Sequence, residues 1–199
     1  MKIPSDRNPS DRIPSDEEIR DLHERLAPSP QAFASVWTHC QIVARIAEQL
    51  HAPDADPKLV RAGCLLHDLG VYRLRPGEHY IRHGLLGHEM LAELGYPETL
   101  RRFCSHHTGV GLTAQDVLAQ QLPLPPGDYL AETGAERLVM YADKFHSKST
   151  PPRFVSAAAY TVAVTRFGED KSATFKAMVA EYGEPDLRDL AAEYGHHLV

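Results

Sequence analysis

Apolar residues recur along most of this 199-residue chain at spacings of three and four, which is typical of one face of an α-helix. The clearest stripe consists of Val36, His39, Val43, Ile46 and Leu50. It predicts a helix over residues 31–51, with His39 facing the core. No segment alternates apolar and polar residues over the length of a useful strand. The pattern therefore predicts an all-α protein.

Turn residues and capping signals divide the rest of the chain into helices. Residues 1–15 repeat a short polar motif with little to bury and are expected to form a mobile tail. Ser15 and Glu18 form a capping-box signature at the start of the first helix. Further helices are predicted over residues 79–94, from Pro97 to His106, over residues 132–146, and two or three times within residues 154–194. We expect residues 16–150 to form the main domain, with helices of residues 151–199 packed on it.

One short stretch, residues 62–70, carries a histidine and a carboxylate at the end of an apolar run. A helix through this stretch places Val60, Cys64 and His67 on one line, and Gly70 is expected to end it in the left-handed conformation. Leucines fill the other faces, so the helix is predicted to be buried nearly all round. A charged Asp68 in such a helix costs several kcal/mol unless it is paired or binds a cation. The Asp68 carboxylate therefore requires a cationic or hydrogen-bonding partner.

Composition and charge narrow the range of partners. The formal net charge of −6 and the pI near 6.0 provide no basic surface, so nucleic acid is not an expected partner, whereas a small anion is allowed. The three cysteines form no CxxC motif and are expected to be reduced core thiols of a cytoplasmic protein. No apolar segment approaches the roughly 20 residues of a membrane span, and the N-terminus has no signal-peptide pattern.

Histidines and carboxylates predicted to face inward occur on several different helices. They are His39, His67, Asp68, His83, His106 or His107, and Asp143. Imidazoles and carboxylates together suit divalent Fe, Mn or Zn. One ion needs about four ligands, so this larger set indicates two ions, with Asp68 the simplest bridge between them. A close pair of cations can polarise a phosphoryl oxygen and activate a water molecule.

The order of these motifs resembles the HD superfamily, which is named after the His67-Asp68 doublet. His39, Leu66-His67-Asp68-Leu69-Gly70, Arg82-His83, His106-His107 and Tyr141-Ala142-Asp143-Lys144 follow one another as in the branch with extra histidines. That branch includes HD-GYP cyclic-dinucleotide phosphodiesterases, symmetrical diadenosine-tetraphosphate hydrolases and di-iron oxygenases related to myo-inositol oxygenase. The Gly-Tyr-Pro signature is missing, which argues against cyclic-dinucleotide hydrolysis. The stretch from His107 to Gly111 is similar to one in small uncharacterised HD proteins.

The resemblance implies an HD-domain helical bundle over residues 16–150 with a binuclear metal site in its core. It implies that His39, His67, Asp68 and Asp143 bind the first ion, and that Asp68, His83 and one of His106 or His107 bind the second. We favour His107, because the stretch that follows it matches the small HD proteins. The ions are expected to be Fe or Mn, with Zn as an alternative.

Further residues follow as candidates for catalysis and phosphate binding. Asp68, His83 and Lys144 are the candidate catalytic residues. No lysine follows Gly70, so the candidates for gripping a substrate phosphate are Arg73, Arg75, Lys144 and Lys148. His146 is expected at the surface or behind the metal ligands, and His51, His196 and His197 at the surface.

The resemblance predicts a phosphohydrolase that cleaves a phosphoester or phosphoanhydride of a small, nucleotide-like molecule with a metal-bound hydroxide. Two alternatives remain open. One is a di-iron oxygenase acting on an organophosphonate or polyol, and the other is a metal-dependent ligand-binding module without turnover. The oligomeric state is also left open, with a homodimer as one option.

Overall fold

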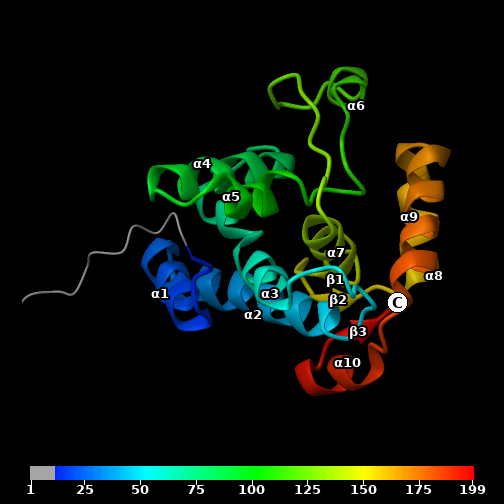
Figure 1. The fold of residues 1–199 in the computed structure, drawn as a ribbon, viewed down its shortest axis with the longest axis horizontal. Coiled ribbons are helices and arrows are strands. Elements are labelled where there is room, and N and C mark those ends of the chain that lie inside the picture. The colour runs from blue at the N-terminus through cyan, green and yellow to red at the C-terminus, as the bar shows by residue number, and fades with distance from the viewer. Residues whose placement is uncertain (1–11) are drawn as a thin grey trace, which may run out of the picture.

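Three helices pack against one another at the centre of the computed structural model, which describes residues 12–199 (Figure 1). They are α2 (Pro30–Ala47), α3 (Pro57–Leu66) and α7 (Gly134–Asp143). Helix α1 (Asp16–Leu26) packs on α2 and α3 and begins at the expected capping box, in which the Ser15 hydroxyl accepts a hydrogen bond from the Glu18 amide. Most of the tail expected at residues 1–15 lies outside the described residues.

A second group of elements covers one end of α3. It consists of the 3₁₀ turns η2 (Leu69–Arg73) and η3 (Tyr80–Arg82) and the helices α4 (His83–Glu93) and α5 (Glu98–Ser105). Helix α4 packs on both α5 and η2, and α5 also contacts α3. The turn that follows the His67-Asp68 doublet is therefore held between α3 and α4.

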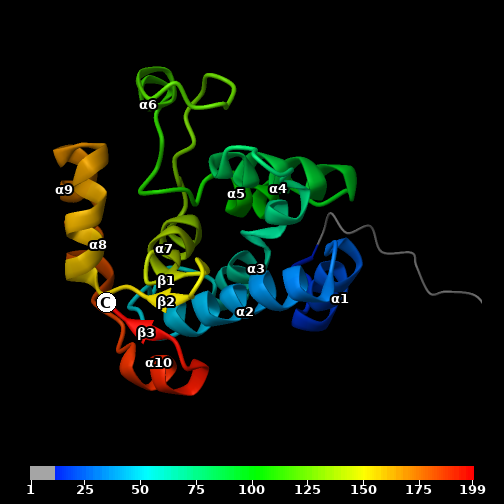
Figure 2. The same cartoon turned by 180° about the vertical axis from the view of Figure 1, so that it is seen from behind.

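The chain after α5 extends away from this bundle and then returns. Helix α6 (Ala114–Ala119) stands on an arm, beside the pair formed by α8 (Ala157–Val164) and α9 (Glu169–Tyr182) (Figures 1 and 2). The 3₁₀ turn η4 (Thr165–Phe167) joins α8 to α9, and α10 (Arg188–Tyr194) follows. The expectation of helices within residues 154–194 is thus confirmed. Helix α6 was not predicted.

Three strands of two residues each form a small sheet at the end of α7. They are β1 (His146–Ser147), β2 (Arg153–Phe154) and β3 (His197–Leu198), in the order β1-β2-β3. Strand β1 is antiparallel to β2, with Ser147 opposite Arg153, and β2 is parallel to β3. These strands are too short for alternation to reveal them in the sequence, and the fold remains helical. The sheet brings the C-terminal residues to the end of α7.

The expected helix end at Gly70 is wrong. Helix α3 ends at Leu66, with His67 as its C-cap, and the chain tightens into η2. A Cβ atom on Gly70 would lie 1.8 Å from the His83 carbonyl oxygen and 2.3 Å from the Gly87 amide nitrogen. Glycine is therefore required by the close approach of η2 to α4, and not by a left-handed cap.

Other helix limits also differ from the predicted ones. The helix expected to reach residue 51 ends at Ala47, and the one expected to start at residue 79 begins at His83 after η3. The helix predicted over residues 132–146 begins after the N-cap Thr133 and stops at Asp143, because the chain turns into β1.

All three cysteines are free and buried, in agreement with the predicted core thiols. Within residues 12–199, no helix has both the length and the apolar character needed to cross a bilayer.

Candidate metal centre

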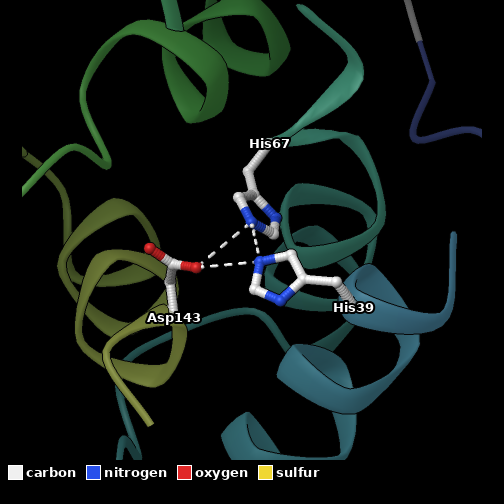
Figure 3. A group of neighbouring side chains, drawn as sticks. All are labelled: His39, His67 and Asp143. Atoms are coloured by element: carbon white, nitrogen blue, oxygen red, sulfur yellow. Dashed lines mark hydrogen bonds and ion pairs between the residues drawn. The ribbon is translucent and has the colours of Figure 1, made fainter. Parts of the chain in front are cut away.

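Four side chains from three parts of the chain meet at the centre of the bundle. His39 comes from the middle of α2, His67 from the C-cap of α3, Asp68 from the residue before η2, and Asp143 from the last turn of α7. His39 Nε2 lies 3.0 Å from Asp143 Oδ1, 3.2 Å from His67 Nε2 and 3.2 Å from Asp68 Oδ2. Figure 3 shows the two imidazoles and the Asp143 carboxylate pointing toward one another.

The spacing of these atoms fits a metal ion. With bonds of about 2.1 Å, tetrahedral or octahedral coordination separates neighbouring ligand atoms by about 3.0–3.4 Å. His67 Nε2 lies 3.5 Å from Asp143 Oδ1 and 3.6 Å from Asp68 Oδ2, so the measured separations fall close to this range. The group therefore has the donor set and the spacing of a divalent metal site.

The second carboxylate oxygen of Asp68 faces two further histidines. Asp68 Oδ1 lies 3.3 Å from His83 Nε2 and 3.8 Å from His107 Nε2, and these two nitrogens are 3.0 Å apart. Asp68 Oδ1 is buried and has no hydrogen-bond partner among the described residues. A buried carboxylate oxygen without a partner is costly, so this position also fits a cation.

The cluster histidines are oriented by a shared pattern of hydrogen bonds. His39, His67, His83 and His107 all direct Nε2 toward the cluster. The Nδ1 atoms of His67, His83 and His107 lie 2.7, 2.6 and 3.0 Å from the backbone carbonyl oxygens of Cys64, Tyr80 and Phe103. A carbonyl only accepts, so Nδ1 carries the proton and Nε2 keeps a lone pair for a metal.

His39 differs because its Nδ1 partner is a side chain. His39 Nδ1 lies 2.8 Å from Nδ1 of the buried His146, whose Nε2 lies 3.0 Å from His196 Nδ1. His196, which was expected at the surface, contacts this buried side chain. It is half-buried in a chain of three imidazoles, because β3 pairs with β2, which in turn pairs with β1. No local sequence signal could reveal a contact between residues 50 positions apart.

The electrostatics of the cluster keep the two carboxylates and His107 in the protonation states that bind metals. Burial alone raises the pKa of Asp68, but the Lys148 ammonium and the surrounding imidazoles hold it well below its usual range. The pKa of Asp143 is also lowered, because Lys144 and His39 outweigh the effect of burial. Burial lowers the pKa of His107 well below its usual value, and the charges of His67 and His83 lower it further. The carboxylates are thus anionic and His107 is neutral. His67 differs, because the neighbouring carboxylates Asp68 and Asp143 raise its pKa despite its burial, so a cation bound there would displace the proton.

Two lysines after α7 contact the carboxylates of the cluster. The buried Lys144 donates hydrogen bonds from Nζ to Asp143 Oδ2, at 2.7 Å, and to the His107 carbonyl oxygen, at 2.9 Å. Lys148 forms an ion pair with Asp68 Oδ2. An ammonium group has three donors, so each lysine retains capacity for another acceptor.

A cavity of about 1030 Å³ opens onto this cluster. The cluster members that line it are His39, Asp68, His83, His107 and Asp143, together with Lys144 and Lys148. Segments 108–112 and 160–171 also line it, so the arm before α6 and the C-terminal helices form its walls. Tyr80 and Phe167, each 49% exposed, line it as well.

Three of the expected site residues lie elsewhere. His106 is half-buried, and its Nδ1 lies 2.6 Å from the Ser105 hydroxyl and not in the cluster. Arg73 forms an ion pair with Glu93, and Arg75 is exposed; neither lines the cavity. The cations that do line it, beyond the expected Lys144 and Lys148, are Arg153, Arg166 and Lys171. Periodicity in the sequence gave no sign of them, because packing of the C-terminal segment decides their position.

A helical bundle with a buried histidine and aspartate cluster beneath a cavity defines a candidate metal-dependent protein. Comparison with protein families gives a match to the HD domain over residues 36–148, which is more than half of the chain. The protein therefore belongs to the HD domain family, and the predicted family is confirmed.

Individual relatives share part of this chain. An uncharacterized protein of Methanocaldococcus jannaschii is 39% identical over 115 residues, which is 55% of this chain and 64% of that protein. The tRNA (cytidine(56)-2'-O)-methyltransferase of Picrophilus torridus is 36% identical over 55% of this chain and 30% of its own length. That of Thermoplasma volcanium is 31% identical over 70% of this chain and 39% of its own length. The chain thus spans less than two thirds of each of these relatives.

Two solved structures are similar in fold. One is the HD domain of the phosphodiesterase PgpH of L. monocytogenes, with 16% identity, a TM-score of 0.45 and coverage of 82% of this chain and 97% of that one. The other is the same domain in complex with cyclic-di-AMP, with 18% identity, a TM-score of 0.47 and coverage of 81% and 95%.

Proposed function

We propose that this protein is a metal-dependent phosphohydrolase that cleaves a phosphoester or phosphoanhydride of a small, nucleotide-like molecule. Membership of the HD family supports a metal-dependent hydrolase. The observation that carries the proposal is the position of Asp68. Its Oδ2 faces His39 and its unpartnered Oδ1 faces His83, so one buried carboxylate serves two adjacent cation positions.

In this proposal, His39, His67, Asp68 and Asp143 hold the first ion, and Asp68, His83 and His107 hold the second. Bound ions supply a Lewis acid for a phosphoryl oxygen and lower the pKa of water. The side chains supply position: Asp68 sets the separation of the two subsites, and Lys144 fixes Asp143 while offering a remaining N–H to a substrate oxygen. Lys148 offers a second cation at the same carboxylate.

The cavity supports a ligand larger than phosphate alone. Its volume of about 1030 Å³ suits a ligand of nucleotide size. Tyr80 and Phe167 expose half of their surfaces and line the cavity, so each offers an aromatic face on which a base can stack. The Tyr80 ring lies with its centroid 4.5 Å from that of His83, which supports a base position next to the proposed second ion.

Metal content tests the two-ion arrangement. Protein loaded with Mn²⁺ and freed of excess ion by gel filtration should hold two equivalents, Asp68→Ala close to none and His83→Ala one. His106→Ala is the matched control, because it removes a histidine next to His107 that lies outside the cluster. Full occupancy in Asp68→Ala, or no loss in His83→Ala, would contradict the shared-carboxylate site.

Turnover separates hydrolysis from the two alternatives. The Mn²⁺-loaded protein should release phosphate from a panel of phosphorylated nucleotides and sugars with O₂ excluded, and Asp68→Ala should abolish the release. Activity that requires both iron and O₂ would instead identify an oxygenase. Metal-dependent binding of panel members without any product would identify a ligand-binding module.

A further inference from the structure

The cavity above the metal cluster is unusually cationic for an acidic protein. Five cationic side chains line it, but only two carboxylates, Asp68 and Asp143, do so. The cations are Lys144, Lys148, Arg153, Arg166 and Lys171. The whole chain has a formal charge of −6, so positive charge is concentrated at this site. Such a distribution favours an anionic ligand.

Three of the five cations are already neutralised. Lys144 pairs with Asp143, Lys148 with Asp68, and Lys171 with Asp116, at 2.6 Å. In contrast, neither Arg153 nor Arg166 has a carboxylate partner anywhere in residues 12–199. Their N–H donors therefore remain available for an anion. The Arg166 guanidinium also stacks on the Phe167 ring, 4.5 Å from its centroid, which uses none of these donors. Both arginines are exposed, so they lie at the mouth of the cavity and not on its buried floor.

Both arginines line the cavity from segments that are tied to the surroundings of the cluster. Arg153 pairs with Ser147 across the β1–β2 ladder, one residue before the lysine that contacts Asp68. Arg166 lies in η4, just before α9. The start of α9 is tied to the segment that follows His107, because Lys171 Nζ contacts the Gly111 carbonyl oxygen at 3.2 Å. Arg153 is therefore linked through β1 to the segment that contacts Asp68, and Arg166 lies in η4, next to the helix that contacts the segment after His107.

We infer that Arg153 and Arg166 form an anion subsite for a second phosphate group, separate from the phosphate held at the metal cluster. This inference rests on the proposed function and narrows its substrate class to molecules with at least two phosphates. A guanidinium group presents two parallel N–H donors that match two oxygens of a phosphate. An arginine without a carboxylate partner also loses no salt bridge when it binds a phosphate. Both arginines lie beyond residue 148, outside the stretch matched to the HD domain. Selection of the substrate is therefore assigned to the C-terminal segment.

Equilibrium binding of ADP and AMP to the Mn²⁺-loaded protein tests this subsite. The two nucleotides share base, sugar and first phosphate and differ in the second phosphate. Arg153→Gln and Arg166→Gln should each weaken ADP binding by about tenfold, as expected for a lost charged hydrogen bond, and AMP binding by less than about twofold. Arg153→Lys keeps the charge without the paired donors and should give an intermediate loss for ADP. Metal content is measured after each titration to exclude stripping of the ion by the nucleotide.

Arg188→Gln is the matched control. Arg188 belongs to the same C-terminal segment, its side chain is 81% exposed, and it pairs with Asp186 away from the cavity. This variant should bind both nucleotides like the wild type. Equal losses for ADP and AMP in the Arg153 and Arg166 variants, or no loss for either, would overturn the subsite.

The binding and turnover experiments distinguish a failure of the subsite from a failure of the proposed hydrolysis. If no phosphate is released from any nucleotide but the ADP-specific loss appears, the subsite stands and the proposed hydrolysis falls. If phosphate is released and the binding ratio does not change, hydrolysis stands and the subsite falls. Where ADP is hydrolysed, the arginine variants should raise KM for ADP with little change in kcat, because they contact the phosphate remote from the reacting one.

Discussion

Replacing His146 tests whether the hydrogen bond behind His39 controls metal binding. His146 is buried, and its Nδ1 lies 2.8 Å from His39 Nδ1. If His39 binds a metal through Nε2, its proton is on Nδ1 and His146 Nδ1 accepts it. The other cluster histidines donate this hydrogen bond to backbone carbonyls, so a side-chain substitution cannot remove their acceptors. His146→Leu keeps a similar volume but removes the acceptor.

The expected magnitude follows from two separate costs. The buried N–H of His39 loses its partner, which destabilises the folded protein by about 1–3 kcal/mol. The ring of His39 is also free to rotate or to move its proton to Nε2, the atom that faces Asp143 and Asp68. Loss of such an outer partner lowers metal affinity by about 10- to 100-fold. Affinity for Mn²⁺ is measured by competition with a chromophoric chelator, and stability by urea unfolding.

Two further variants make the test specific. His146→Gln supplies an amide oxygen that can accept the same proton, so it should recover most of the affinity. His196→Ala removes only the outermost, half-buried imidazole and should have a much smaller effect. A folded His146→Leu protein with the Mn²⁺ affinity of the wild type would refute the reasoning, because His39 would then be oriented without its partner.

Two predictions concern stability. Gly70→Ala places a methyl group against the His83 and Gly87 backbones and should reduce the free energy of unfolding by about 3 kcal/mol or more, whereas Gly134→Ala, which has open space around it, should be neutral or slightly stabilising in the same urea titration. His23 is buried with both ring nitrogens hydrogen-bonded, and burial lowers its pKa from 6.5 to about 4. The unfolded chain therefore binds more protons at this residue between these values. The contribution of His23 to the free energy of unfolding is thus constant above about pH 6.5 and falls by up to about 3 kcal/mol toward pH 4. Chelator-treated His23→Leu protein should lose this part of the slope; an unchanged slope would contradict the assignment.

The sequence could reveal the ligands of the candidate site because each lies within or next to a segment with helical periodicity. His39 lies on an apolar stripe, and Asp68 and Asp143 interrupt apolar runs where an unpaired charge is costly. Such positions need a partner in any helical fold. The order of the motifs along the chain then indicated the family. Helical spacing alone could not distinguish His107 from His106, because adjacent residues at a helix end can both approach one site; only the resemblance of the following stretch favoured His107. The carbonyl of Phe103 and the hydroxyl of Ser105 orient these two rings differently.

The local sequence pattern by itself determined that this chain is helical, where most helices lie, and which side chains must be buried together. Helix propensity, capping and hydrophobic periodicity act over a few residues and can therefore be recognised in the sequence alone. Tertiary structure alone decided that α3 stops before Asp68, because η2 must approach α4 closely at Gly70. It also decided that Arg153 and Arg166 line the cavity and that His196 contacts His146, since β-pairing and helix packing link residues far apart in the sequence. Such contacts depend on the shape of the assembled chain, which no local pattern encodes.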